Sequence, residues 1–521
     1  TRSLILSTVY SPTEIQSCRK PVIPSSQCYS MFYLIHLILL VLLSWTAAAG
    51  NAESLACRVL TTEFPKQVSF PGDATYNLSL SSYSYAQEQM MFPACIFQPV
   101  TTPDVACAVR ALRNSSAAFA IRSGGHATNP GFSNIGGGVT IDLTTINDVH
   151  IHEDGVTVSV GTGATWGDVY RVLDASGRSL NGGRASGVGI GGYLLGGGIG
   201  FFALKHGFGC DAVVGAEVVL SSGKVIETRI DSHPQLFRAL KGGSNNFGIV
   251  TRWDIATIAQ GHMWGGGVTY PSNTTAQQLE AFTQWKSSEN FDAYSSVEQS
   301  HVWIGSSQTQ VISNSIIYTK PIKFPSNLKN YTNIKPQLSS TLRVSNVSDF
   351  AEEIQSYSTP NQNTIYVTTT VRITPTILTK VHSLWRASVE VLSAKSTITS
   401  SLTLQSIPAP PSDPTRANSL GFDPASTPQK DLVLVLLTIF WEDTMIGEHA
   451  TKSAVEFVQD VDRLAQQESA TDRFRYPNYA GAGQAPLLHN GQLDFLRKVA
   501  AQYDPDCMFH RQVPGGWKLY P

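Results

Sequence analysis

The sequence predicts an α+β protein of two domains, and three observations lead to this prediction. The chain has 521 residues, more than one ordinary hydrophobic core organises. Short helix-like and strand-like segments, joined by glycine-rich loops, alternate over residues 57–262. Long alternating strands separated by helices fill residues 263–475, as in a large antiparallel sheet backed by helices. We therefore expect one domain over each range, followed by a C-terminal segment over residues 476–521.

The elements of the first domain follow from local periodicity. Apolar residues recur at helical spacing in some segments, and others are short apolar or alternating runs typical of strands. We expect helices at 104–112 and 233–243, strands at 117–123, 138–143 and 247–258, a strand followed by a helix at 155–177, and a hairpin at 212–227.

The second domain is expected to consist mainly of long strands with one polar and one apolar face, which is the pattern of an antiparallel sheet covered on one side. We expect these strands at 297–305, 309–319, 363–374, 401–407 and 432–443, a helix at 374–393, and an amphipathic helix at 490–505 in the C-terminal segment.

The charge balance excludes one class of partner. Lys and Arg number 37 and Asp and Glu 39, which leaves a formal net charge of -2. The sequence has no basic stripe, so a nucleic-acid partner has no electrostatic basis. Charged residues make up 15%, below the roughly 25% of an average soluble chain. This composition is typical of a secreted, loop-rich protein.

Residues 31–50 form an apolar segment about as long as a membrane span. It ends in Ala47–Ala49, an A-x-A cleavage pattern, and polar sequence follows without a stop-transfer charge cluster. We interpret it as a secretory signal peptide, with a membrane anchor as the alternative. Residues 1–30, which begin at Thr1, are interpreted as an upstream or non-native segment. The expected location is therefore extracellular, without a stable membrane anchor.

Two further patterns support export. Sequons of the form N-x-S/T, which accept N-linked glycans, occur at Asn77, Asn114, Asn273, Asn330 and Asn346. The part after the signal contains five cysteines without C-x-x-C or metal-ligand spacing, so one or two disulfides and a leftover thiol are expected, with the pairing open. These are Cys57, Cys95, Cys107, Cys210 and Cys507.

Glycine is concentrated in three loops, at residues 122–126, 161–167 and 187–200. The third contains G-x-G-x-x-G, with Asp211 near the place of a ribose-binding acid, so a Rossmann dinucleotide site is one interpretation. However, glycine continues where the crossover helix of that fold should run, and each helical glycine costs about 1 kcal/mol. We prefer the alternative that the three loops converge on one large ligand, whose pyrophosphate binds exposed backbone N–H groups.

Other cofactor sites are not indicated. The sequence has no G-K-[ST] P-loop and no metal-binding motif, so no metal is expected. The closely spaced His150 and His152 fit a strand better than a metal site.

Five longer motifs identify a family. In order they are FAIRSGGHATNPGFSN, TGATWGDVY, GGRASGVGIGGYLLGGGIGFF, LFRALKGGSNNFGIVT and YDPDCMFHRQVPGGWKL. Their order and spacing, from about Cys57 to Pro521, resemble the berberine-bridge-enzyme-like branch of the vanillyl alcohol oxidase/p-cresol methylhydroxylase (PCMH) flavoproteins, and its secreted fungal members in particular. The resemblance implies a PCMH-type, two-part FAD-binding domain to which the C-terminal segment returns, and a substrate domain with a large antiparallel sheet.

The resemblance also implies how FAD is held. In this family the histidine of R-S-G-G-H is bonded to the flavin 8α-methyl group, and the matching residue is His126. Many relatives attach the flavin a second time through a cysteine, but Ala185 stands at that position and has no thiol, so a single attachment is expected. With the glycine loops, the cofactor-binding candidates are Arg122, Ser123, Gly124, Gly125, His126, Gly161, Gly163, Ala164, Gly187, Gly191, Gly192, Gly196, Gly197, Gly198, Ile249, Asn478 and Tyr479.

Three residues are candidates for catalysis. Tyr476 matches the tyrosine that acts as base on the substrate hydroxyl, but Leu434 and Leu436 stand where plant relatives activate that tyrosine with a K-x-Q pattern. A tyrosine with a pKa near 10 is then a poor base, and a shape-forming role for Tyr476 is the alternative. Gln405 is expected to face the substrate. Val188 matches the residue on the oxygen approach to the flavin, where a small side chain favours an oxidase, although packing of a turn explains it as well.

The resemblance predicts an FAD-dependent oxidase whose partners are a small-molecule substrate and molecular oxygen, and we expect the protein to be a monomer. The substrate, an alcohol, sugar or specialised metabolite, would transfer hydride from carbon to flavin N5, and oxygen would be reduced to hydrogen peroxide. One alternative is a flavin dehydrogenase or a cyclising or desaturating enzyme of secondary metabolism. Another is a catalytically silent flavin- or sugar-binding glycoprotein. The resemblance to plant members also implies a disulfide between Cys57 and Cys107.

Overall fold

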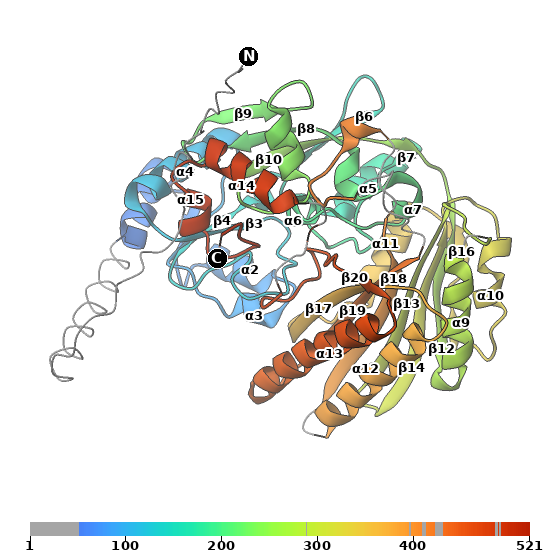
Figure 1. Ribbon diagram of the computed structural model, residues 1–521. Helices are drawn as coiled ribbons and strands as arrows, with labels where there is room; N and C mark the ends of the chain where they lie inside the picture. The colour runs from blue at the N-terminus through green and yellow to red at the C-terminus, as the bar shows by residue number, and fades with distance from the viewer. Residues whose placement is uncertain are drawn as a thin grey trace, which may run out of the picture.

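The computed structural model describes residues 52–287, 289–394, 397–408, 413–422, 431–484, 488 and 491–520. The expected upstream segment and signal peptide lie outside these residues. Figure 1 shows two parts: a mixed α/β part that contains most of the N-terminal half and the C-terminus, and a large sheet with helices along its outer face. The α+β prediction is therefore confirmed.

The first part contains two sheets. The four-stranded sheet has the order β1 (Val68–Ser69), β2 (Cys95–Phe97), β4 (Val139–Asp142), β3 (Phe119–Arg122), in which β4 runs parallel to both β2 and β3. The five-stranded sheet is antiparallel, with the order β5 (Val149–Ile151), β6 (Thr157–Gly161), β10 (Ile249–Ala256), β8 (Val213–Val219), β9 (Val225–Thr228).

Two of the helices around these sheets begin at side-chain caps that the sequence supplies. A capping box of Thr101 and Asp104 starts α4 (Thr102–Ser115), and one of Thr165 and Asp168 starts α5 (Trp166–Asp174). The remaining helices of this part are α2 (Ala74–Ser81), α3 (Ala86–Gln89), α6 (Ile190–Leu195), α7 (Ala203–His206) and α8 (Pro234–Leu240). Because α6 has only six residues, the glycine-rich segment has no long Rossmann crossover helix.

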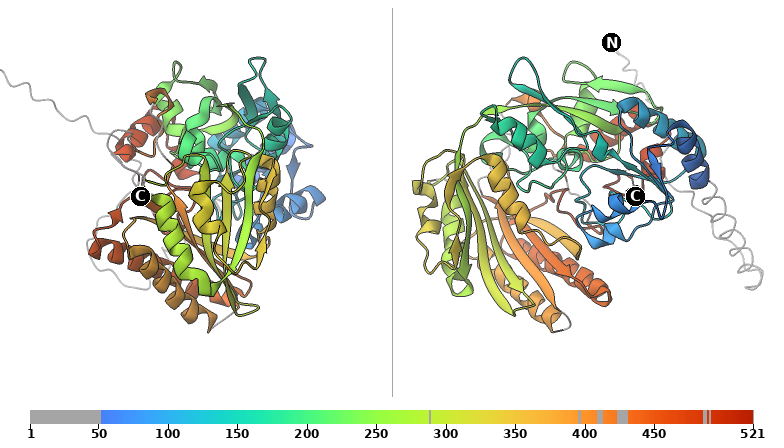
Figure 2. Two further views of the ribbon diagram at one scale, coloured as in Figure 1. Left: turned by 90° about the vertical axis from the view of Figure 1, so that its right-hand side faces the viewer. Right: turned by 180° about the vertical axis from the view of Figure 1, so that it is seen from behind.

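The second part is built on a nine-stranded antiparallel sheet. Its order is β15 (Ser339–Ser340), β12 (Met263–Pro271), β14 (Thr309–Tyr318), β13 (Ser295–Ile304), β18 (Ile398–Ser406), β19 (Leu432–Trp441), β17 (Asn363–Arg372), β20 (Thr471–Asp472), and β16 (Arg343–Ser345) pairs with β12. Helices α9 (Thr275–Lys286), α12 (Ile377–Ser393) and α13 (Gly447–Gln467) cover its outer face, and its other face is turned toward the first part (Figures 1 and 2).

Strand β12 was not predicted, because it carries the run Gly265–Gly267, and glycine is poor in strands. Its glycines are required by packing. A Cβ on Gly265 would lie 2.3 Å from the carbonyl oxygen of Ile316 on β14, and one on Gly266 would lie 2.7 Å from that of Thr341. The neighbouring backbone segments therefore lie too close to leave room for a side chain at Gly265 or Gly266.

The C-terminal segment packs against the first part. It contains α14 (Gln492–Tyr503) and α15 (Met508–Arg511). The amide of Gln512 donates to the carbonyls of Leu112 and Ala117 at 2.9 Å, and the backbone N–H of Phe119 donates to Gln512 O. Figure 1 shows α14 and α15 beside α4 and the sheets of this part.

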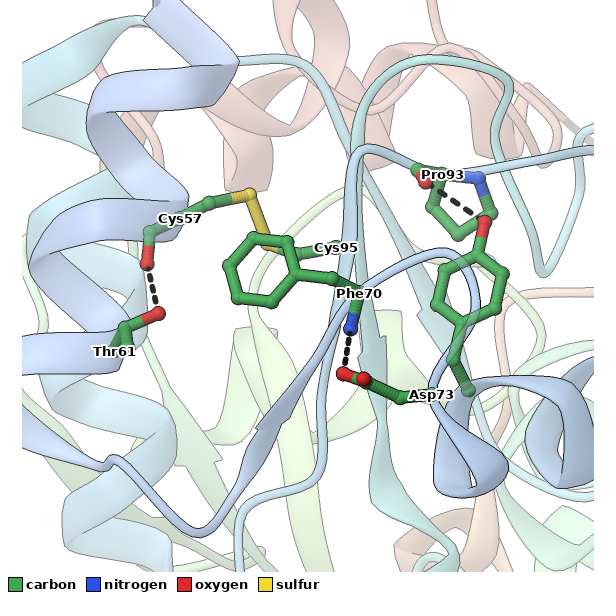
Figure 3. The surroundings of a disulfide bond; sticks show 7 residues. Cys57, Thr61, Phe70, Asp73, Pro93 and Cys95 are labelled. Carbon is green, nitrogen blue, oxygen red and sulfur yellow. Dashed lines mark hydrogen bonds between the residues drawn. A yellow bond between two sulfur atoms is a disulfide. The ribbon is translucent and has the colours of Figure 1, made fainter.

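The disulfide differs from the expected pairing. Cys57, on helical residues 52–63, is bonded to Cys95 of β2 with a Cα–Cα distance of 6.1 Å (Figure 3). Cys107 is a free, half-buried thiol, so the expected bond between Cys57 and Cys107 is wrong. The reason lies in helix periodicity: Val105, Val109 and Leu112 form the buried stripe of α4, and Cys107 falls outside it.

Within the described residues, no helix is both long and apolar enough to cross a membrane. All five sequon asparagines are exposed.

Candidate active site

A cavity of about 600 Å³ lies between the glycine loops of the first part and the inner face of the nine-stranded sheet. The first part contributes residues of the loops 123–129 and 183–196, together with 244–250 and 476–479. The sheet contributes a mainly polar roof, whose residues include Glu298, Ser300 and Val302 of β13, Ser313, Ser315 and Ile317 of β14, Tyr366 of β17, Thr399, Ser401, Thr403 and Gln405 of β18, and Leu436, Thr438 and Phe440 of β19.

Two of the glycine loops touch each other through their backbones. A Cβ on Gly124 would lie 2.5 Å from Gly189 N, and one on Gly189 would lie 2.2 Å from Gly124 N. Gly125 has a φ of +67°, in the left-handed region that favours glycine. For Gly192, also on the wall, no atom of the described residues lies within 4 Å of a built Cβ. The first two glycines are therefore needed for loop packing, whereas Gly192 borders open space.

His126 lies on the cavity wall beside Tyr85. The two rings meet edge to face, with centroids 5.3 Å apart. Burial lowers the pKa of the His126 imidazole below its ordinary value, so the ring is neutral at neutral pH. The Tyr85 hydroxyl lies 3.3 Å from that of Tyr366 on the roof, so both parts of the molecule meet near His126.

Many of the predicted site residues line this one cavity. They are Ser123, Gly124, Gly125, His126, Val188, Gly191, Gly192, Gly196, Ile249, Gln405, Tyr476, Asn478 and Tyr479, and Ala185 lies on the same wall. The prediction that separate glycine loops face one large space therefore agrees with the geometry of the first and third loops.

The structure places the other candidates behind the wall. The Arg122 guanidinium is ion-paired with Asp142 at 3.4 Å and donates to Ser79 O at 2.6 Å. A Cβ on Gly163 would lie 1.8 Å from Leu143 O, and one on Gly198 would lie 2.2 Å from the Tyr193 ring. The candidates outside the lining are Arg122, Gly161, Gly163, Ala164, Gly187, Gly197 and Gly198. The glycines among them allow backbone segments of the loops to pack closely together.

Among the described residues, no cation lies in hydrogen-bond contact with Tyr476. Its hydroxyl accepts a hydrogen bond from the Asn478 side chain at 3.0 Å. Burial, with a contribution from Tyr479, raises the pKa of the Tyr476 phenol well above 10. Leu434 is fully buried and Leu436 lines the cavity, so both places of the missing K-x-Q pattern are apolar. This environment favours a neutral phenol.

A buried arginine that sequence reasoning missed organises the polar side of the cavity. The Arg184 terminal nitrogen Nη2 lies 3.0 Å from Glu298 Oε1, and it donates to Gln405 Oε1 at 2.7 Å and to the Tyr479 hydroxyl oxygen at 2.8 Å. Glu298 and Gln405 are direct partners across β13 and β18. Arg184 precedes Ala185 in the G-R-A motif, and this adjacency was the one available signal. Glu298 gave none, because it resembles any polar residue of an alternating strand.

Burial raises the pKa of the Glu298 carboxyl above its ordinary value, and the Arg184 guanidinium opposes this shift. The same two effects act on the Tyr479 phenol, because burial raises its pKa and Arg184 lowers it. Within the described residues, no group of three or more His, Cys, Asp or Glu side chains is arranged to hold a metal ion.

The chain resembles known flavoproteins over most of its length. A family model described as an FAD binding domain matches residues 93–229. The FAD-dependent monooxygenase sdcF of Emericella nidulans is 34% identical over 483 residues, which cover 90% of this chain and 99% of that protein. The FAD-dependent monooxygenase FUP4 of Fusarium proliferatum is 32% identical over 464 residues, or 84% of this chain and 87% of that protein.

Solved structures show the same fold at lower identity. The 6-hydroxy-D-nicotine oxidase of Arthrobacter nicotinovorans matches with a TM-score of 0.72 at 20% identity, covering 87% of this chain and 98% of that one. The xylooligosaccharide oxidase of Myceliophthora thermophila also matches with a TM-score of 0.72 at 20% identity, covering 90% and 99%. BBE-like 1 of Physcomitrella patens matches with a TM-score of 0.70 at 16% identity, covering 89% and 99%. The family model and the sequence relatives show that the chain is an FAD-linked oxidoreductase of the family to which these fungal FAD-dependent monooxygenases belong, and the solved structures show that it has the fold of the berberine-bridge-enzyme-like flavoproteins.

Proposed function

We propose that the protein is a secreted, monomeric oxidase that carries FAD attached through His126 alone, removes hydride from a C–H bond of an alcohol, sugar or specialised metabolite, and passes the electrons to oxygen. The observation that carries the proposal is the position of His126, a neutral imidazole on the wall of the large cavity. Ala185 stands on the same wall and has no thiol for a second bond.

The residues on the wall fit FAD. Gly192 borders space that no protein atom fills, and Thr162 Oγ1 and Ser133 Oγ are buried on the wall without a hydrogen-bond partner in the described part of the chain. Such groups are expected to bond to a ligand. The loops with His126 and Gly192 would hold the cofactor, which supplies a hydride acceptor and a reductant for oxygen when bound.

The chain's own share of the chemistry is placement and proton handling. A neutral His126 has a lone pair available for a covalent bond, which an imidazolium lacks. The roof would hold the substrate against the opposite wall, with Arg184 and Glu298 as the charged groups on the polar side. Val188, half-buried on the cavity wall, would leave room for oxygen.

Acid denaturation of the purified protein tests the attachment. After denaturation, in-gel flavin fluorescence and peptide mass mapping should locate flavin on the peptide that contains His126 and on no other peptide. A His126→Ala variant should release its flavin into the supernatant. Release of all flavin from the unmodified protein would contradict the proposed attachment.

An oxygen-electrode screen over alcohols, sugars and polycyclic metabolites tests the reaction class. An oxidase consumes oxygen and yields an equal amount of hydrogen peroxide, whereas a dehydrogenase turns over only with artificial acceptors. A silent binder would keep its flavin oxidised with every donor.

A monooxygenase is the second candidate, because several relatives at 30–34% identity, among them sdcF, FUP4 and CTB5, carry that name. Turnover under ¹⁸O₂ separates the two. Isotope in the product without stoichiometric peroxide would identify a monooxygenase, and unlabelled product with peroxide would identify an oxidase.

The proposed secretion is supported by the exposure of all five sequon asparagines. N-terminal sequencing of protein from culture medium, and the mass change on deglycosylation, would test the cleavage site and the glycans.

A further inference from the structure

We propose that Glu298 is the group that accepts the substrate's hydroxyl proton in this site, with Gln405 as the hydrogen-bond donor that orients the same hydroxyl. The inference rests on the proposed function, since it concerns the proton released when a C–H bond next to a hydroxyl is oxidised. It assigns the role of base to a strand of the roof that the Tyr476 motif does not include.

Glu298 and Gln405 present complementary atoms to the cavity. Both line it, and they are direct cross-strand neighbours. Glu298 Oε1 is paired with Arg184, while its Oε2 has no hydrogen-bond partner among the described residues. Gln405 is 1% exposed, and its Oε1 accepts from Arg184. Its buried Nε2 makes no close hydrogen bond among the described residues and has only a longer contact with the Tyr479 hydroxyl. An acceptor and a donor that can both bind a ligand therefore lie side by side.

An unpartnered buried amide N–H costs about 1–3 kcal/mol, so Gln405 Nε2 is expected to bond to a ligand. An alcohol hydroxyl satisfies both positions, because its oxygen accepts from Gln405 Nε2 while its hydrogen is donated to Glu298 Oε2. A group that can only accept would leave the carboxylate without a partner.

The alternative base, Tyr476, has the wrong protonation state. Its pKa is raised by burial, and within the described part of the chain its hydroxyl is bonded to the Asn478 side chain and to no cation. For Glu298, burial raises the pKa of the carboxyl, while the Arg184 guanidinium 3.0 Å away favours its ionised form. A carboxylate with a raised pKa is also a stronger proton acceptor than an ordinary one, which suits it to act as a general base.

The proton balance follows directly. Oxidation of a CH–OH group to a carbonyl releases one hydride equivalent, which is accepted by the FAD of the proposed function, and one hydroxyl proton. The O–H bond breaks as the proton moves to Glu298, which becomes a neutral carboxylic acid. Arg184 then loses its anionic partner for that moment, while its bonds to Gln405 and Tyr479 hold it in place.

Difference infrared spectroscopy on the flavin-loaded protein tests the inference without a substrate. A pH titration should show a carboxylic C=O band that is missing in Glu298→Gln and that titrates above the usual value of about 4.3. A Glu298 band that titrates at or below the usual value would mark a fixed structural ion pair and overturn the proposal. Glu227→Gln is the matched control, because it removes the carboxylate of an Arg–Glu pair, with Arg252, outside the cavity.

Kinetics with a substrate from the oxygen screen give the second readout. Anaerobic flavin bleaching by Glu298→Gln should be at least ~100-fold slower, with substrate binding nearly unchanged and partial rescue by Glu298→Asp. An unchanged bleaching rate would overturn the proposal. In-gel fluorescence distinguishes this failure from failure of the proposed function: Glu298→Gln keeps flavin on His126 in the first case, and unmodified protein lacks attached flavin or turnover in the second.

Discussion

Replacing Gly189 by alanine is expected to force the two glycine loops apart. The backbone at Gly189 has φ −74° and ψ 149°, which any residue adopts, so the substitution adds no conformational strain. Its Cβ would lie 2.2 Å from Gly124 N and 2.6 Å from Gly124 Cα. Atoms attract at about 3.5–4.0 Å, and the atoms in the way are backbone, so the loops must separate by about 1 Å.

Gly189→Ala should lower the free energy of unfolding by about 3 kcal/mol, the upper end of the range for overpacked sites. In a unit of this size, such a loss lowers the unfolding temperature by roughly 6–12 °C. Thermal unfolding followed by circular dichroism measures the shift. Gly192→Ala is the matched control, since its Cβ would meet no atom of the described chain segments within 4 Å and the position is helical.

The two variants should differ in kind. Gly192→Ala should leave the unfolding temperature of the flavin-free protein unchanged or slightly raised, because alanine is the better helix former. It should reduce flavin content, because the methyl group enters the space proposed for FAD. An unfolding temperature for Gly189→Ala within about 2 °C of the unmodified protein would refute the predicted contact between the loops.

Three further predictions follow from the structure. Cys95→Ser should destabilise the fold by about 4 kcal/mol, as expected for opening a 38-residue separation, whereas Cys107→Ser should not; calorimetry and thiol counting check both, and equal losses would contradict the pairing with Cys57. Burial and the neighbouring His382 lower the pKa of His301 to about 3. Below pH 6.5 the His301 side chain therefore binds a proton in the unfolded chain but stays neutral in the folded chain. Stability should therefore fall between pH 6.5 and 3 by up to about 1.4 kcal/mol per pH unit, and denaturant titrations should show a shallower fall for His301→Gln; an equal slope would exclude this histidine as the cause. Ala185→Cys should create a second flavin bond, so that peptide mapping finds flavin bridging the peptides of residues 126 and 185; attachment to the His126 peptide alone would show that the thiol does not reach.

Most of the fold could be predicted from local sequence. The strands β13, β14, β17 and β18 carry polar residues on the face that lines the cavity and mainly apolar residues on the face that packs on helices, whereas β19 is apolar along nearly its whole length and was found as an apolar run. The glycine-rich strand β12 could not be found this way. Its glycines are required by the close approach of the backbone at Ile316 and Thr341, which lie far along the chain.

The candidate site was predictable only in its motif-bearing half. His126, Tyr476 and Asn478 belong to continuous motifs, and the structure brings them to one cavity. Arg122 belongs to such a motif too, yet its side chain forms an ion pair with Asp142 behind the cavity wall. Proximity in sequence therefore predicted the loop but not the direction of each side chain.

The sequence by itself determined the family, the histidine available for flavin attachment and the absence of a thiol at Ala185, because residue identity and spacing within a loop are enough for these conclusions. Only the tertiary structure decided that Cys57 pairs with Cys95, since that depends on which face of α4 carries Cys107. It also decided that Arg184 meets Glu298 and Gln405, which lie on two strands far along the chain. Strand register and the docking of the sheet on the loops bring these groups together, and neither is encoded in any short stretch of sequence.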